Sequence, residues 1–544
     1  MKRLLICLAV FVLLLSGCGH TGQSAEGTHI RLSDNSITVD GKEITNDSTQ
    51  AVYSARDIVF YLADQGFTYG EGEKADEHEQ SEADAHTVVH ITKPGRYVLS
   101  GELSLGQIAV DLGEEAETDP EAVVTLVLSG VNITCEVAPA IIFYNVYECC
   151  SSDAETATKD VDTSKAGANV VIADGTENNI SGSYVAKIYK SYELSEDGTE
   201  IADSKKLHKY DGAFYSKKTM NINGGESGTG ILNIKAENEG LDSELHLTIN
   251  GGIINITSGN DGINTNEDNV SVTTVNGGEL HILCDGSSGE GDGIDSNGWL
   301  VINGGTLTAQ ACATSGDAGI DSDKGIYING GSVMASGSML DRIAGGDQTY
   351  AVFGFASRQN GGSTYTLKNA AGEAAAAYTP TNSFSYLIVA GDELAPGDYT
   401  FWQDETQLAG SQANAMQGGM PVMPNGEMPE IPEGEQNGQN VPPAIPEGME
   451  RPEKPDGEFP QGELPVMPEG EMPEPPAGEM PVMPDGEIPE MPTGEPPAMP
   501  DGMTPPDRGG GMMGGNRMPG GETSTTFTIV KGGNQFSGVL PAAS

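Results

Sequence analysis

The chain has 544 residues, of which 80 are acidic and 27 are basic, so its formal net charge at pH 7 is -53. Such a surface repels nucleic acid and anionic lipid headgroups, which excludes proteins that bind either of them by charge. The density of carboxylates favours divalent cations as partners, although extended acidic loops need no metal.

The first residues have the layout of a bacterial secretory signal. Two basic residues precede an apolar run over residues 4–15, which is shorter than the roughly 20 residues of a membrane-spanning helix. The run ends in Leu-Ser-Gly-Cys, which resembles the lipobox in which the cysteine is acylated before cleavage. We expect a signal peptide over residues 1–17, lipid attachment at Cys18, a lipidated linker over 18–29 and a cell-surface location outside the cytoplasmic membrane. An ordinary signal with a chance cysteine is the alternative.

Five further cysteines follow, an odd number that cannot all pair. No Cys-x-x-Cys pair is present, so zinc binding by sulfur is not expected. The sequence predicts structural thiols with at most a local disulfide, and it leaves the pairing of the two adjacent cysteines open. The five are Cys135, Cys149, Cys150, Cys284 and Cys312.

Residues 30–120 alternate short apolar runs with glycine and proline turns, which predicts an N-terminal β region. Residues 50–62 are a candidate helix within it. Residues 71–86 are crowded with Glu and Asp and have no periodic apolar residue, so they are predicted to form a solvated loop.

An internal repeat dominates residues 121–345. Asn-Gly-Gly follows Ile or Val at five places, with spacings of 27, 26, 27 and 26 residues. A constant period of this length indicates stacked units that bury their apolar faces only against their neighbours. Apolar residues alternate around each motif, as expected of strands with one face in and one face out. The glycines allow positive φ at a corner, and the asparagines can form a hydrogen-bonded ladder along the stack. The motifs begin at Asn223, Asn250, Asn276, Asn303 and Asn329.

These features predict an all-β chain built around a right-handed parallel β-helix over residues 121–345. A leucine-rich repeat has a similar period but needs a leucine framework that is missing here, and a β-propeller needs longer blades. Residues 346–410 are predicted to be a β cap. Residues 411–521 are dense in Pro, Met, Gly and Glu, which predicts a disordered acidic linker. Residues 522–544 turn strand-like again and are expected to return to the cap.

A second turn recurs in the repeats as Asp-Gly-Ile-Asp-Ser or a close variant. Stacking would place Asp295 and Asp321 about 4.8 Å apart, where they repel by roughly 3 to 4 kcal/mol at an effective dielectric of about 20. A shared Ca²⁺ removes this penalty, because calcium takes about six to eight oxygen ligands. Solvated residues favoured by turn chemistry alone are the alternative. The candidate calcium ligands are Asp242, Asp261, Asn264, Asp292, Asp295, Asp317, Asp321 and Asp323.

Several segments together resemble the clostridial cellulose-binding β-helix proteins, which are carbohydrate-binding domain-containing lipoproteins similar to pectate lyases. The resemblance rests on Ile-Thr-Lys-Pro-Gly-Arg-Tyr-Val-Leu-Ser-Gly at residues 91–101, on residues 126–133 and 174–178, and on the repeats. It implies a calcium-binding β-helix that binds cellulose or acidic plant glycans, such as polygalacturonate, without catalysis.

Trp299 and Tyr327 are predicted at outward positions of successive strands, where they can form a stacking platform for sugar rings; isolated surface aromatics are the alternative. The main rival function is a calcium-dependent polysaccharide (pectate) lyase, in which Lys324, Arg342 or Arg358 would abstract the proton α to a uronate carboxylate. A structural or adhesive cell-surface stalk is the third class. No catalytic residue is assigned.

Overall fold

The computed structural model describes residues 26–56, 58, 69–70, 80–184, 187–194, 201–206, 210–413 and 523–542. The expected signal peptide, Cys18 and all but the first three residues of the predicted linker (residues 411–521) lie outside them. The described part is nearly all-β, as predicted, with one α-helix, α1 (Gln80–Ala85), and a 3-10 helix at Glu114–Thr118. Neither helix of this part of the chain is long and apolar enough to cross a bilayer.

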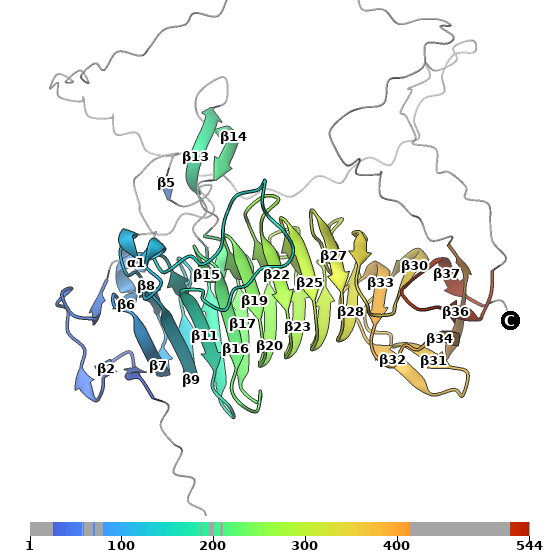
Figure 1. Ribbon diagram of the computed structural model, residues 1–544, viewed down its shortest axis with the longest axis horizontal. Helices are drawn as coiled ribbons and strands as arrows, with labels where there is room; N and C mark the ends of the chain where they lie inside the picture. The colour runs from blue at the N-terminus through green and yellow to red at the C-terminus, as the bar shows by residue number, and fades with distance from the viewer. Residues whose placement is uncertain are drawn as a thin grey trace, which may run out of the picture. The chain divides into compact units, whose positions relative to one another are not determined.

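Three parallel ladders hold the repeats together (Figure 1), and successive repeats add strands to them. The first ladder runs through β7 (Gly95–Leu103), β9 (Val124–Thr134), β11 (Ala168–Ile172), β16 (Met220–Gly224), β19 (His246–Ile249), β22 (Val272–Val275), β25 (Trp299–Ile302), β27 (Gly325–Ile328) and β29 (Ile343–Gly345). The second runs from β9 through β12 (Glu177–Gly182), β17 (Ile231–Ala236), β20 (Ile253–Ser258), β23 (Glu279–Cys284), β26 (Thr306–Gln310) and β28 (Ser332–Gly337). The third runs through β6 (Thr87–Ile91), β8 (Gly106–Val110), β10 (Ile141–Phe143), β15 (Gly212–Ser216), β18 (Glu239–Ser243), β21 (Ile263–Thr265) and β24 (Ile294–Ser296).

Antiparallel strands join both ends of the ladders. β1 (Thr28–Leu32) pairs in parallel with β7 and antiparallel with β2 (Thr38–Val39), which pairs with β3 (Lys42–Glu43). At the other end β33 (Phe384–Ala390) pairs antiparallel with β28 and with β30 (Tyr350–Gln359). The remaining strands there are β31 (Tyr365–Asn369), β32 (Ala374–Tyr378), β34 (Gly397–Gln403), β35 (Thr406–Gln412), β36 (Phe527–Ile529) and β37 (Gly533–Pro541). β36 pairs with β34, so strands on either side of the Pro/Met-rich stretch are neighbours in one sheet.

Two expectations for the N-terminal part are corrected. The candidate helix is wrong where it is described, because Val52–Ala55 form β4, which pairs antiparallel with β6 and stacks Tyr53 on His90 at 4.6 Å. The end of the predicted acidic loop forms α1, where Ala83 is buried in the core. β13 (Lys187–Leu194) pairs antiparallel with β14 (Ile201–Lys206) and with β5 (Tyr69–Gly70).

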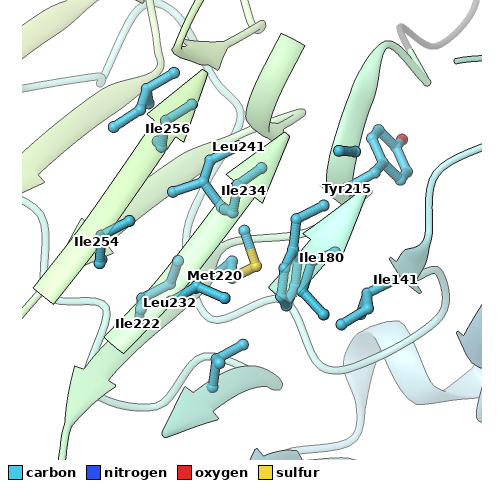
Figure 2. Close-up of a cluster of buried hydrophobic side chains, with 14 of the residues drawn as sticks. Ile141, Ile180, Tyr215, Met220, Ile222, Leu232, Ile234, Leu241, Ile254 and Ile256 are labelled. Carbon is cyan, nitrogen blue, oxygen red and sulfur yellow. The ribbon is translucent and has the colours of Figure 1, made fainter. Parts of the chain in front are cut away.

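The inward side chains of the ladders form a continuous apolar core. One column of register partners in the second ladder consists of buried branched residues, and Figure 2 shows Leu232 and Ile254 in the cluster that also holds Met220. Each fully buried Leu or Ile contributes about 1.5–3 kcal/mol relative to an exposed side chain. Because this column runs through five successive strands of the second ladder, neighbouring repeats stabilise one another. The column contains Leu232, Ile254, Leu280, Leu307 and Val333.

The Asn-Gly-Gly motif forms the corner between the first and second ladders. The predicted asparagine ladder is confirmed, because each side-chain amide donates to the preceding asparagine from Asn250 to Asn329, over 2.8 to 2.9 Å. In the four motifs from Asn250 onward the second glycine has positive φ, for example 90° at Gly278, and a Cβ there would lie 2.6 Å from Gly252 O. Only glycine satisfies both the backbone angle and the close approach.

Candidate cation-binding site

The third ladder brings the second turns of successive repeats together. Asp242 pairs in register with Asn264, and Asn264 with Asp295. The backbone N–H of Asp321 donates to Ile294 O over 2.7 Å, which continues the series by one repeat. As predicted, Asp295 and Asp321 therefore belong to adjacent repeats. Their side chains alternate with the inward isoleucines and so share the outer face of the ladder.

A second set of acids precedes these positions in the same turns. Asp261 Oδ1 accepts the backbone N–H of Asp292 over 2.7 Å, and the side-chain amide of Asn264 donates to Glu239 Oε1 over 2.9 Å. The same amide lies 3.4 Å from Asp261 Oδ2. We call both sets together the acidic row: Glu239, Asp242, Asp261, Asn264, Asp292, Asp295 and Asp321.

Burial makes ionisation of the carboxyl groups in the acidic row energetically unfavourable. Asp242 is 0% exposed and Asp261 is 8% exposed, and burial followed by the charge of Glu239 raises both pKa values well above the usual range of aspartate. Burial also raises the pKa of Asp292 to about 8, and burial with the charge of Asp341 raises the pKa of Asp321 to about 7. Without a cation the row therefore retains protons near neutral pH.

Two amide oxygens extend the acceptor set. Asn264 is 3% exposed and Asn266 is 7% exposed, and the Oδ1 atom of each lacks a hydrogen-bond donor within the described residues. Asn266 donates from Nδ2 to Asp242 Oδ1, so its amide lies against the row. A buried carbonyl oxygen without a donor is unfavourable unless a cation or water contacts it.

The donor set fits a hard cation. Its members offer carboxylate and amide oxygens, which are the ligands of calcium. In the part of the chain that the structure describes, no three of these carboxylates bring oxygens within 4.8 Å of one another. An ion in the row would therefore need amide oxygens, backbone oxygens and water in addition to one or two carboxylates.

The remaining predicted ligands lie at the edge of this arrangement. Asp317 Oδ2 accepts the backbone N–H of Gly291 over 2.6 Å, whereas Asp323 is exposed. The sequence analysis missed Glu239 and Asn266. Glu239 takes the first position of a turn that begins with aspartate at Asp211, Asp261 and Asp292. Asn266 follows Asn264 by two residues, so the strand period was the available signal.

The predicted aromatic platform has a different geometry from the one expected. Trp299 pairs with Gly325, and Tyr327 pairs with Val301, so the two rings are two residues out of register. The reason is that β25 and β27 are offset by 26 residues, whereas Trp299 and Tyr327 are 28 apart. A lysine ammonium group lies over each ring. Lys324 Nζ is 5.6 Å from the Trp299 ring centroid, and Lys159 Nζ is 5.2 Å from the Tyr327 ring centroid.

The three basic residues considered for a lyase have other contacts. Lys324 lies over the Trp299 ring, and its backbone carbonyl accepts a hydrogen bond of 2.9 Å from Arg342. The guanidinium of Arg358 donates to Ser383 Oγ over 3.1 Å and to the carbonyl of Ala313. These contacts do not direct the three cations at one point of the acidic row.

Comparison with known proteins identifies the family. Residues 85–376 match the family described as carbohydrate-binding domain-containing protein. A protein of that description from Acetivibrio thermocellus is 31% identical over 170 residues, which cover 31% of this chain and 44% of the relative. The chain thus spans less than half the length of that curated relative. A gadolinium derivative of a polysaccharide lyase-like protein from C. thermocellum is similar with 20% identity and a TM-score of 0.32, covering 59% of this chain and 92% of that chain. From the match over residues 85–376, the chain belongs to the carbohydrate-binding domain-containing protein family.

Proposed function

We propose that this protein is a calcium-stabilised, non-catalytic polysaccharide-binding lipoprotein of the cell surface. The family supports a carbohydrate ligand, and the N-terminal sequence up to Cys18 supports export and lipid anchoring. The in-register parallel ladders support a right-handed parallel β-helix as the scaffold, with residues 411–521 as a spacer. Cellulose or an acidic plant glycan such as polygalacturonate is the expected ligand.

The proposal of calcium binding rests on one observation: carboxylates of like charge are buried beside amide oxygens that can accept a cation. Asp242 and Asp261 would hold an ion together with the amide oxygen of Asn264 and water, and two carboxylates from the set Asp292, Asp295 and Asp321 would hold a second one. Asp317 and Asp323 flank this second position. Bound Ca²⁺ would supply positive charge that lets the carboxylates ionise without repulsion. Its role in this proposal is to stabilise the stack of repeats.

The glycan part rests on the two ring and ammonium pairs. An exposed ring face stacks on a sugar, and an ammonium group beside it can pair with a uronate carboxylate. Trp299 with Lys324 offers both groups, and so does Tyr327 with Lys159, although the Lys159 ammonium also pairs with Asp160 Oδ1 over 2.6 Å. This pairing favours an acidic glycan over cellulose.

The test combines calorimetry with retention on insoluble glycans. The purified protein is titrated with Ca²⁺, then mixed with insoluble cellulose or polygalacturonate with and without chelator, while the absorbance of unsaturated products is followed. Calcium heat, with glycan retention that weakens in chelator and no new absorbance, is the expected result. New absorbance would instead make the protein a lyase, and the absence of both heat and retention would favour a surface stalk.

A further inference from the structure

A long loop between β10 and β11 crosses the outer face of the first ladder (Figure 1). We call residues 144–167 the crossing loop. Its Thr163 contacts two strands: the carbonyl oxygen accepts the side-chain amide of Asn221 over 2.8 Å, and Oγ1 donates to Thr248 Oγ1 over 2.8 Å. Lys159 reaches Tyr327, three strands further along the ladder. The loop therefore covers part of the face that carries the aromatic residues.

The start of the crossing loop holds two thiols and a carboxylate. Cys149 Sγ and Cys150 Sγ are 3.3 Å apart, and one oxygen of Glu148 lies within 4.8 Å of both. Among the described residues this is the one group of three or more His, Cys, Asp or Glu side chains close enough to share a metal ion. All three side chains are partly exposed, so an ion can reach them from solvent.

Three hydrogen bonds from Thr219 and Cys150 hold the carboxylate of Glu148 in place. Its Oε1 accepts the backbone N–H of Cys150 and the hydroxyl of Thr219, each over 2.8 Å, and its Oε2 accepts the backbone N–H of Thr219 over 2.8 Å. A carboxylate oriented by three donors keeps its position while still offering lone pairs to a cation.

The sulfur geometry favours a chelated ion over a disulfide. A disulfide needs sulfurs about 2.05 Å apart and Cα atoms usually about 4.4 to 6.8 Å apart, whereas adjacent residues place their Cα atoms at about 3.8 Å. Two thiolates on a tetrahedral ion with bonds of about 2.3 Å lie roughly 3.8 Å apart. The observed 3.3 Å is closer to the chelate than to the bond.

The chemistry of the group selects a soft cation. Two sulfurs with one oxygen suit zinc and related d¹⁰ ions rather than calcium, so the site is distinct from the acidic row. His246 contacts Cys150, and its Nδ1 accepts the backbone N–H of Val272 over 3.0 Å. Because Nδ1 already accepts this hydrogen bond, Nε2 is the ring nitrogen left to face the sulfur, so His246 can orient the Cys150 side chain beside the ion.

We propose that Glu148, Cys149 and Cys150 bind a thiophilic divalent cation such as Zn²⁺ or Cd²⁺, with water in a fourth position. The bound ion would join the start of the crossing loop to the chain at Thr219, the residue before β16. Adjacent cysteines do not match the spacing of common zinc motifs, which is why the sequence did not predict sulfur ligation.

Cadmium is the probe of choice because its thiolate complexes absorb in the ultraviolet. The purified, reduced protein is titrated with Cd²⁺ and then with competing Zn²⁺, and cysteine alkylation is mapped by mass spectrometry with and without the ion. We expect one equivalent of Cd²⁺ to produce charge-transfer absorbance and to protect Cys149 and Cys150 from alkylation, whereas the buried thiol of Cys312 should react slowly with or without the ion. Zn²⁺ should displace the signal.

Variants identify the ligands. The double variant Cys149→Ser/Cys150→Ser should lose the absorbance, and Glu148→Gln should bind more weakly. Cys312→Ser is the matched control, because this thiol already lies 3.2 Å from Thr314 Oγ1 and 3.0 Å from Ser315 Oγ. Absorbance that survives in the double variant would overturn the proposal. Alkylation at Cys149 and Cys150 that Cd²⁺ does not slow in the unaltered protein would overturn it as well, whether or not the variants fold.

Discussion

The side-chain amide of Asn264 donates to Glu239 Oε1 over 2.9 Å, which joins two buried side chains of successive repeats. Asn264 occupies the register position that Asp242 and Asp295 occupy in the flanking repeats. A neutral amide here separates two aspartates and supplies both a donor to one carboxylate and an oxygen for a cation. The amide of Asn264 therefore interrupts the column of carboxylates at one repeat, which lowers the repulsion between Asp242 and Asp295.

Asp242→Asn should separate calcium binding from folding. Because the variant keeps the shape of a buried side chain but removes its charge, we expect unchanged or higher stability in chelator. Calcium should raise the melting temperature of the variant less than that of the unaltered protein, because only the second position still binds, whereas each occupied position should add about 2.7 kcal/mol at a calcium concentration of about 100 times Kd. Asp347→Asn, on an exposed carboxylate, is the control. Equal calcium stabilisation of both variants would remove Asp242 from the site.

The apoprotein should become less stable as pH rises. The pKa of Asp292 is raised to about 8 and that of Asp321 to about 7, whereas an unfolded aspartate titrates near about 3.9. Between these limits the folded state binds more protons than the unfolded state, so its stability is greatest at the acidic end. The loss approaches about 1.4 kcal/mol per pH unit for Asp292 and is smaller for the more solvated Asp321.

Thermal melts in chelator from about pH 5 to pH 8 measure this slope. Saturating calcium should flatten it, because a bound ion favours ionised carboxylates. The double variant Asp292→Asn/Asp321→Asn should make it shallower without calcium and leave the part that comes from Asp242 and Asp261. A melting temperature that rises with pH in chelator would contradict the assignment of raised pKa values.

Gly278→Ala tests the corner between the first and second ladders. Gly289→Ala, outside the Asn-Gly-Gly motifs, is its control. Both glycines have positive φ, 90° and 104°, so alanine costs about 1–2 kcal/mol at either position. At Gly278 the added methyl group would also meet Gly252 O at 2.6 Å, whereas nothing lies within 4 Å at Gly289. We expect Gly278→Ala to cost at least about 1 kcal/mol more in denaturant unfolding. Equal costs would mean that the corner relaxes freely.

Asn276→Ala interrupts the asparagine ladder at its centre. Asn276 donates to Asn250 and accepts from Asn303, each over 2.9 Å. Because these amides are exposed, water can replace the lost partners, and we expect a loss of about 1 kcal/mol in the free energy of unfolding. Asn35→Ala, an exposed asparagine outside the repeats, should cost less. If both variants lost the same free energy of unfolding, the asparagine ladder would contribute nothing to stability.

Trp299→Ala should weaken retention on the glycan. Trp402 is the matched control, since it also has an ammonium group over its ring, with Lys368 Nζ 4.6 Å from the centroid, but it belongs to the C-terminal strands. We expect retention on polygalacturonate to fall about tenfold for Trp299→Ala, which corresponds to about 1.4 kcal/mol. Retention that falls equally in Trp402→Ala would remove the specific role of Trp299.

The local features of this protein follow from its sequence by itself. Alternation of apolar residues predicts strands, the constant period predicts stacked repeats, and Asn-Gly-Gly predicts both the corner and the ladder from Asn250 to Asn329. These features depend on residues close together in the chain, or on copies of one pattern, so short-range rules are sufficient to predict them.

Only the tertiary structure decided which of the predicted residues meet, and how deeply they are buried. The offset between β25 and β27 separates Trp299 from Tyr327, and the path of the crossing loop brings Lys159 to that tyrosine. The same path places Glu148 against Thr219, 71 residues later. Contacts of this range depend on how loops cross a sheet, and the burial that shifts a pKa depends on all neighbours at once, so neither can be predicted from spacing along the chain.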